Sequence, residues 1–328
     1  MLGFVLRRLI GAAAVLLAVS ILSFALFQFV GDPVTNLVSI EATAADRERL
    51  RQELGLDDPV AVQFARYLGR ALRGDFGVSY RLRQPVERLI SARAPATLEL
   101  SFMAALLALT VGVPLGVYTG IYARSWISRT VLTVSLIGVS IPTFLIGILL
   151  ILLFSVQLGW LPSFGRGEVV ELGWWSTGFL TASGMKAIIL PAVTLSLFQM
   201  TLLMRLVRSE MLEVLRTDYI KFARARGLTN RAVHYGHALR NTLIPVITVT
   251  GLQLGSIIAF AIVTETVFQW PGLGLLFVQA MGTADVPLMA CYLMLIALIF
   301  VSINLVVDLL YFAVDPRLRS DTAEVRMG

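Results

Sequence analysis

The sequence predicts an all-α membrane protein whose chain crosses the bilayer six times. Of its 328 residues, 57% are apolar and 15% are charged, and the mean hydropathy is +0.81. Soluble domains carry roughly 25% charged residues, so this composition excludes an ordinary water-soluble enzyme, a disordered chain and a coiled coil. Six charge-free runs approach the length of about 20 apolar residues that a membrane-crossing helix needs. These runs are Leu9–Val30, Leu100–Ile121, Val131–Val156, Ala187–Met204, Thr242–Thr264 and Leu288–Val307.

Two further features of the runs need interpretation. The first run follows Arg7 and Arg8 as a secretory signal would, but its apolar core exceeds the h-region length of about 7–15 residues and no A-x-A-like site follows. It is therefore predicted to be an uncleaved first helix. Another charge-free run, Thr266–Ala284, is interrupted by Trp-Pro-Gly-Leu-Gly from Trp270 onward, and its glutamines would lie unpaired in lipid. That run is predicted to be an apolar loop dipping into the outer interface.

The placement of arginine predicts the orientation, because short cytoplasmic loops collect Lys and Arg. With six spans, every short basic segment falls on one side of the membrane. These segments are 7–8, 124–129, 205–241 and 317–319. Both termini are therefore predicted to be cytoplasmic. The chain then divides into an N-terminus with the first helix (1–30), an external loop domain (31–96), a five-helix core (97–312) containing a cytoplasmic loop (205–241), and a cytoplasmic tail (313–328).

The external loop carries signals for two short helices. One is predicted over Ala44–Leu54, and the other begins after Asp58, an N-cap candidate followed by proline, and ends at Gly74. The pattern leaves two interpretations open. The loop is either a small soluble cap on the membrane domain or a docking surface or lid for an external partner.

The cytoplasmic loop 205–241 is basic and amphipathic. Asp218 is suited to cap a new helix and Gly227 to end it, which predicts a short surface helix over Tyr219–Arg226. The pattern alone favours attraction of this loop to anionic lipid heads over docking to a protein partner.

Catalytic and metal sites are not indicated. His234 and His237 are three residues apart, but no Cys, Asp or Glu follows at ligand spacing, so a structural or interface role is favoured. The single cysteine, Cys291, excludes a disulfide. A secondary transporter needs ionisable groups at the membrane midplane, and an intramembrane enzyme needs a nucleophile, paired acids or zinc ligands there. The spans contain none of these, so both classes are disfavoured.

The spans offer candidate pathway residues and candidate contacts between helices. Pro142, with Ser140 and Thr143 beside it, lies near the middle of the third run, where it predicts a helix kink or a contact with a polar solute. The G-x-x-x-G spacings on spans two and five permit close helix approach. They comprise Gly112, Gly116 and Gly120 on one span and Gly251 and Gly255 on the other.

Three acids border the spans: Glu99, Glu265 and Asp308. A charge near the interface is far less unfavourable than one at mid-helix, which is assigned roughly 2.5–3.5 kcal/mol. These acids are therefore expected to mark the water boundary. The alternative for Glu265 is that it closes an outer gate with the Trp270 loop.

The cytoplasmic loop also carries a family resemblance. Thr217–Leu228 (TDYIKFARARGL), His237–Asn241 (HALRN) and Ile244-Pro245 resemble the signature loop of ABC-importer permeases, in the dipeptide, oligopeptide and nickel branch. Lys221-Phe222-Ala223 replaces the Glu-Ala-Ala that begins the general signature, which is typical of the peptide branch. Further segments agree in order and spacing: Leu54–Asp57, Gly74–Gly77, Arg93–Leu100, Ile189–Ala192, Glu265–Phe268, Trp270–Gly274, Asp308–Tyr311 and Asp315–Arg317.

The resemblance implies a type I importer fold in a bacterial inner membrane and a non-enzymatic permease for peptides, with glutathione or nickel chelates as alternative cargoes. The implied partners are a second homologous permease, two ATPase subunits that bind ATP and Mg, an external solute-binding protein and membrane lipid, but no nucleic acid. The chain itself would hold no cofactor or metal. The implied ATPase-coupling residues are Asp218, Tyr219, Lys221, Ala223, Arg224, Ala225, Arg226 and Gly227.

Overall fold

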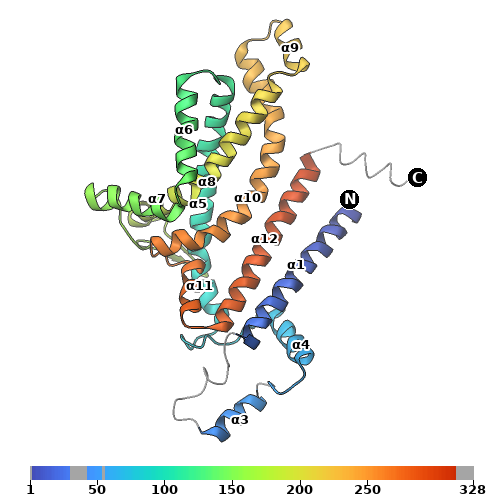
Figure 1. Ribbon diagram of the computed structural model, residues 1–328, viewed down its shortest axis with the longest axis vertical. Coiled ribbons are helices and arrows are strands. Elements are labelled where there is room, and N and C mark those ends of the chain that lie inside the picture. Colours follow the sequence, from blue (N-terminus) through green and yellow to red (C-terminus); the bar gives the residue numbers. More distant parts are fainter. Residues whose placement is uncertain (1, 30–42, 54–55, 315–328) are drawn as a thin grey trace, which may run out of the picture.

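The computed structural model describes residues 2–29, 43–53 and 56–314, and most of this part of the chain is helical (Figure 1). The helices in chain order are α1 (Leu2–Phe29), α3 (Ala44–Glu53), α4 (Val60–Ala71), α5 (Val86–Ile121), α6 (Trp126–Ser140), α7 (Thr143–Leu150), the π-helix η1 (Ile151–Gln157), α8 (Ala182–Val214), α9 (Asp218–Ala225), the π-helix η2 (Ala232–Ala238), α10 (Leu239–Val267), α11 (Leu273–Gly282) and α12 (Val286–Val314). A two-stranded antiparallel hairpin, β1 (Val170–Leu172) with β2 (Trp175–Thr177), precedes α8. The long helices form one bundle with α9 at one end and α3 and α4 at the other, which we call the α9 end and the α4 end.

Within the described residues, five helices are long and apolar enough to cross a membrane: α1, α5, α8, α10 and α12. Counting α6 together with α7 and η1 as one bent span gives six, in agreement with the predicted number. Helix α5 begins at Val86, well before the apolar run predicted for the second span. Its 36 residues correspond to about 54 Å, so the helix is longer than a hydrocarbon core of roughly 30 Å.

The third predicted span is broken rather than kinked. Helix α6 ends at Ser140, α7 begins at Thr143, and the two segments meet at 106°. Pro142 adopts an extended conformation (φ −54°, ψ 135°) as the N-cap of α7. Proline has no N–H to continue the first helix, and it disfavours the helical conformation of the residue before it. The kink predicted at Pro142 of the run Val131–Val156 is therefore a full break between two helices.

Glycines bring the long helices together, as the G-x-x-x-G spacings predicted. A β carbon at Gly116 of α5 would lie 2.7 Å from the carbonyl oxygen of Met204 in α8, so the two backbones are in direct contact. Gly251 and Gly255 on α10 likewise face the side chains of Val307 and Phe300 on α12, where any β carbon would overlap. The core of the bundle consequently rests on α5 against α8 and α10 against α12.

The α4 end contains the two short helices that the loop signals predicted. Helix α4 packs on α1 through aromatic rings, with Phe24 and Phe64 centroids 5.4 Å apart. The predicted cap is wrong in detail, because Pro59 occupies the N-cap position and Asp58 instead forms an ion pair with Arg66 at 2.6 Å. The run Thr266–Ala284 does not span, as expected, but it is not a simple loop. It contains α11, whose Leu273 and other apolar side chains are buried in the bundle.

Candidate functional site

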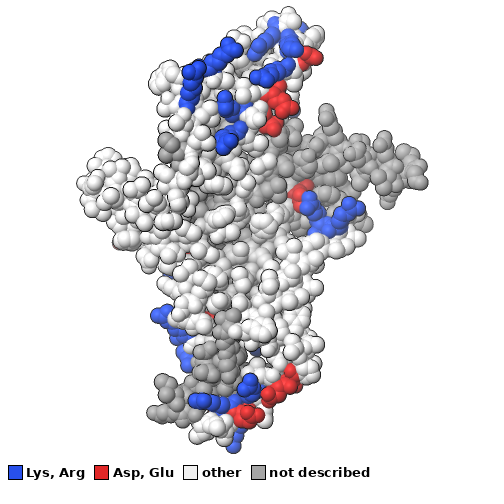
Figure 2. All heavy atoms as spheres, in the orientation of Figure 1, with Lys and Arg blue, Asp and Glu red and all other residues white. Residues whose placement is uncertain are grey.

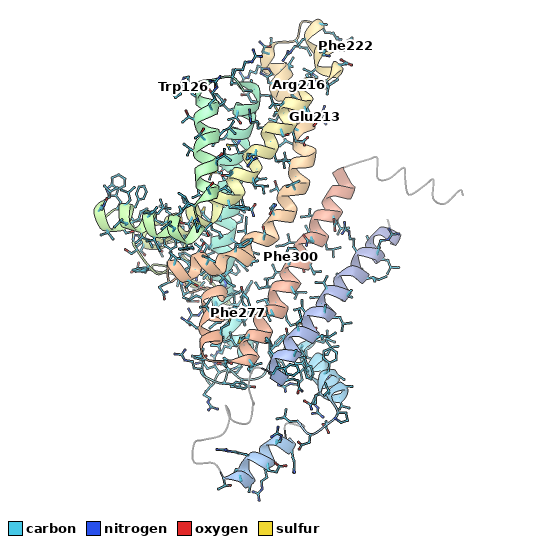
Figure 3. The ribbon with its side chains drawn as sticks, viewed as in Figure 1. Trp126, Glu213, Arg216, Phe222, Phe277 and Phe300 are labelled. Carbon is cyan, nitrogen blue, oxygen red and sulfur yellow. The ribbon has the colours of Figure 1, made fainter. Side chains whose placement is uncertain are left out.

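Helix α9 lies between α8 and η2 at the outermost point of the α9 end, where Figure 3 places Phe222. The sequence predicted this helix within one residue at each terminus. Thr217, rather than Asp218, is the N-cap residue, and Asp218 begins the helix with its carboxylate 2.8 Å from Lys221 Nζ. Gly227 follows the helix with φ +78°, the left-handed conformation expected of it.

The two faces of α9 differ. Ile220 and Ala223 are buried in an apolar cluster with Val207 and Met211 of α8, so the inner face is fixed to the bundle. The outer face is accessible and basic: Lys221, Phe222, Arg224, Ala225 and Arg226 are all exposed. Phe222 is 64% exposed, and the Arg226 guanidinium lies 5.8 Å from the centre of its ring. Figure 2 shows Lys and Arg side chains gathered at this end of the molecule.

His237 of η2 contacts α9. The Tyr219 hydroxyl forms a hydrogen bond with Nδ1 of His237, and the two rings lie edge to face. Burial lowers the pKa of His234 below its usual value, and the nearby positive charge of Arg224 lowers it further. The structural role favoured from the sequence therefore has a specific contact for His237. Within the described residues, no group of three or more His, Cys, Asp or Glu side chains is arranged to hold a metal ion.

At the other end of α10, Glu265 and Trp270 belong to one buried polar cluster. The Glu265 side chain is fully buried, accepting a hydrogen bond of 2.6 Å from the Thr97 hydroxyl and one of 2.9 Å from the Leu275 N–H. Trp270 donates its ring N–H to the carbonyl oxygen of Ala96 at 2.9 Å. The carboxylate thus caps the first turn of α11, where a negative charge is favoured. The expectation that Glu265 marks the water boundary is wrong.

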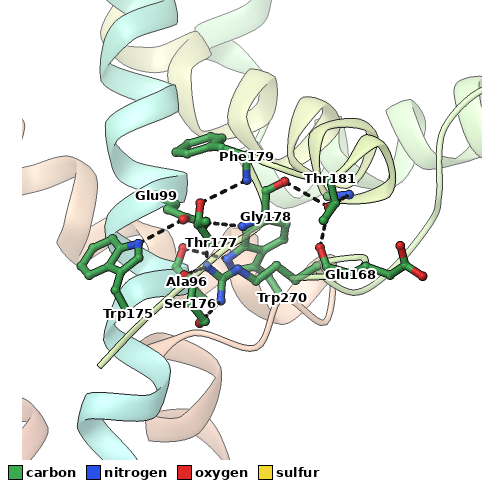
Figure 4. A network of polar contacts seen from close by, with 12 residues as sticks. Ala96, Glu99, Glu168, Trp175, Ser176, Thr177, Gly178, Phe179, Thr181 and Trp270 are labelled. Atoms are coloured by element: carbon green, nitrogen blue, oxygen red, sulfur yellow. Dashed lines mark hydrogen bonds and ion pairs between the residues drawn. The ribbon is translucent and has the colours of Figure 1, made fainter. Parts of the chain in front are cut away.

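A second buried cluster was not predicted. Glu99 of α5 is 3% exposed and Arg166 is 7% exposed, and their Oε2 and Nη2 atoms lie 2.6 Å apart (Figure 4). Arg166 also donates to the carbonyl oxygen of Ser176, while the Gly178 N–H donates to Glu99. Glu99 therefore attaches the β1–β2 hairpin to α5, and the boundary role expected for it is also wrong. The available signal was that Arg166 is the only Lys or Arg between Thr130 and Met185.

The structure brings the break at Pro142 near the Glu265 cluster through α7. A β carbon at Gly147 of α7 would lie 3.1 Å from the ring of Phe268, which follows α10 directly. Ser140 uses its hydroxyl within its own helix, donating to Leu136 O at 2.9 Å, and Pro142 is exposed. The pathway role of Ser140, Pro142 and Thr143 stays a prediction.

Comparisons with known proteins agree with this architecture. The family model described as "binding-protein-dependent transport system inner membrane component" matches residues 112–320, and the model of its N-terminal part matches residues 1–101. A putative peptide transport system permease protein of Brucella abortus is 40% identical to this chain. The match covers 98% of this chain and the full length of the Brucella protein. The glutathione transport system permease protein of Salmonella paratyphi A (39%) and the oligopeptide transport system permease protein of Bacillus subtilis (40%) each match 97% of this chain and 99% of their own length.

Among solved structures, the MetNI methionine ABC transporter in inward-facing conformations has a chain that matches 69% of this one. That match covers 96% of the MetNI chain, with a TM-score of 0.54 and 22% sequence identity. At this identity the likeness concerns the fold alone, and it supports the predicted type I importer architecture.

Proposed function

Because this chain belongs to the binding-protein-dependent transport system inner membrane components, we propose that it conducts peptides across the inner membrane and receives its driving force at α9. The chain is a multi-pass permease subunit of a bacterial ABC importer and not an enzyme. Such a system works with ATPase and binding-protein partners, so ATP and its Mg are held by other chains. The substrate, the coupling surface, the orientation and the second permease are the proposed parts.

The coupling proposal is supported by the difference between the two faces of α9. Its inner face is fixed by Ile220 and Ala223, while its outer face presents Phe222 and three cations to the surroundings. A short helix of this kind fits a groove with acidic walls on an ATPase subunit. Helix α9 follows α8 after a short turn, and η2 connects it to α10. A displacement of α9 would therefore be passed to both long helices as a rigid-body movement.

The proposed cargo is a peptide, with glutathione or a nickel chelate as alternatives. Support comes from the relatives, whose names specify peptide, glutathione and oligopeptide transport. The proposed pathway passes the break at Pro142, beside Ser140 and Thr143. We further propose that Glu265 and Trp270 close it at the α4 end, because their buried cluster joins α5, α10 and α11.

The test is uptake of a labelled peptide into proteoliposomes that contain the chain with its ATPase, permease and binding-protein partners. Ala225→Glu and Arg224→Glu place negative charge on the exposed face of α9, and both are expected to abolish uptake while the complex still inserts in the membrane. Arg129→Glu is the matched control, because it reverses an exposed charge at the same end but outside α9. Unchanged uptake in both α9 variants would contradict the coupling proposal, and equal loss in the control would indicate a general charge effect.

The proposed orientation places the α9 end and both termini in the cytoplasm. The basic surface of the α9 end supports it through the positive-inside rule. The sole cysteine is buried, so an Arg224→Cys variant offers one accessible thiol. A membrane-impermeant maleimide is expected to label that thiol in inverted vesicles and not in intact cells, and the reverse pattern would overturn the orientation.

The proposed second permease would form a heterodimer with this chain. Support comes from the exposed apolar side chains of α7 and η1, among them Phe144, Ile148 and Val156. A photocrosslinker at position 148 is expected to capture the second permease when the two are co-expressed. Capture of lipid alone would count against a dimer interface at α7.

A further inference from the structure

A groove of about 360 Å³ runs between the first turns of α1 and the last turns of α12. Its walls are apolar, formed by Gly11, Ala12 and Val15 on one side and Phe300 and Leu305 on the other. The groove exists because residues 11 and 12 are small: a β carbon on Gly11 would meet nothing within 4 Å. An apolar groove of this volume suits a hydrocarbon chain.

Charged side chains line the mouth of the groove, two of them arginines. Arg8 lies 2.8 Å from Asp308 across the mouth, its side chain half exposed. Arg7 lines the same opening and is exposed, and no acidic side chain of the described residues lies within ion-pair distance of it. Arg7 therefore presents its guanidinium group at the mouth of the groove. Figure 2 shows blue and red side chains together at the level where α1 begins.

Asn304 adds a second feature at the mouth. Its side-chain oxygen is buried and accepts no hydrogen bond, although the residue lines the groove. A buried carbonyl oxygen without a donor is unfavourable by about 1–3 kcal/mol, so a ligand that brings a hydroxyl or an ammonium group would relieve this. The mouth therefore offers both a site for an anion and an acceptor for a neighbouring donor.

The length of α1 places the groove near one edge of the hydrocarbon core of a bilayer. Arg8 and Phe29 are separated by 29 − 8 = 21 residues of α1, which at 1.5 Å per residue is about 31 Å. This equals the hydrocarbon thickness of roughly 30 Å. The arginines consequently lie at one headgroup level, and the apolar walls lie at the level of the adjoining acyl chains.

We propose that this groove binds one anionic phospholipid. Arg7 and Arg8 hold its phosphate, an acyl chain lies along Gly11 and Phe300, and a headgroup hydroxyl donates to Asn304. Guanidinium groups match phosphate oxygens well, and basic pockets between membrane helices select anionic headgroups. The leaflet follows from the proposed orientation and is the cytoplasmic one, whereas the ligand chemistry does not depend on the orientation.

The experiment measures lipid retention by native mass spectrometry of the purified transporter complex, without ATP or peptide. The complex is first reconstituted in equal parts of phosphatidylglycerol and phosphatidylcholine. Retention of phosphatidylglycerol in preference to phosphatidylcholine is expected. Arg7→Gln should lower that preference about fivefold, the equivalent of roughly 1 kcal/mol for one basic residue at a membrane surface. Gly11→Leu fills the groove and should abolish retention.

Arg47→Gln is the matched control, because Arg47 is exposed on α3 and its loss should leave lipid retention unchanged. The proposal is overturned if both lipids are retained equally, if Arg7→Gln has no effect, or if millimolar inorganic phosphate displaces the lipid. It is also overturned if a peptide of residues 313–328 competes for the groove or if the second permease covers it. Because retention is measured without transport, its failure is distinguishable from a failure of the coupling proposal.

Discussion

The buried Glu99–Arg166 pair predicts a large effect from a small substitution. Glu99→Gln keeps an oxygen that accepts from the Gly178 N–H but removes the charge that faces Arg166. Both side chains are at least nine-tenths buried, so the arginine is left as an uncompensated buried charge. Removing one partner of such a pair typically costs about 3–5 kcal/mol. The hydrogen bonds from Arg166 to Ser176 remain, which places the expected value near the lower limit.

Hydrogen exchange of the segment 166–181 measures this effect directly. An opening free energy lowered by ~3 kcal/mol corresponds to about 150-fold faster exchange, since each 1.4 kcal/mol is a factor of ten. The double variant Glu99→Leu with Arg166→Met removes both charges, and its exchange is expected to lie much closer to that of the parent. Exchange in α9 serves as the internal control and should not change. If Glu99→Gln exchanges within threefold of the parent, or if the double variant exchanges as fast as the single one, the reasoning is refuted.

Three further predictions concern other parts of the chain. Gly116→Ala places a β carbon against the backbone of α8 and should destabilise the protein by about 1–3 kcal/mol. Gly138→Ala should not, because Gly138 has open space around it. Thermal unfolding in detergent compares the two variants. Gly227→Val forces a β-branched residue into φ +78°, so it should fray the end of α9 and reduce peptide-stimulated ATPase activity in the complex by at least twofold, with Gly236→Val as the comparison. Because burial and Arg224 lower the pKa of His234 from 6.5, the unfolded loop takes up a proton before the folded loop does as the pH falls. The packing of α9 on η2 is then complete above pH 6.5 and weakens below it, so trypsin should cleave residues 216–231 faster at about pH 5.5 in the parent but not in His234→Gln.

Local signals sufficed for the parts of the fold that local chemistry determines. The long apolar runs located α1 and α12, and Gly227 located the end of α9, because each depends on residues adjacent in the chain. The bend at Pro142 was predicted as a kink, since proline acts on the preceding turn. Its size was not predictable, because the direction of α7 depends on the contact of Gly147 with Phe268, more than a hundred residues further along the chain.

The candidate site shows the same division. The amphipathic pattern and the family resemblance identified α9. The implied coupling residues, however, included Ala223, which is buried against α8, and left out Phe222, which is exposed. The two buried carboxylates were misassigned, because the assumption that acids at the ends of apolar runs face water ignores distant partners. Glu265 forms a hydrogen bond with Thr97, 168 residues away in the chain, and Glu99 pairs with Arg166, 67 residues away. Helix α11 was missed for a related reason, since the carboxylate that caps it lies on α10.

The position of α10 connects the two ends of the proposed mechanism. It begins where η2 ends and includes Glu265, so about 43 Å of helix axis, counted over its 29 residues, connects the α9 loop with the buried polar cluster. Midway it is joined to α8 by a hydrogen bond of 2.8 Å from the Gln199 amide to the Ser256 hydroxyl. Because both helices that flank α9 are joined in this way, we expect a push on α9 to move them together rather than apart. A gate at Glu265 and Trp270 would therefore respond to α9 as one unit with α8, and a Gln199→Leu variant, which removes the joint, would leave ATP hydrolysis running with reduced peptide uptake.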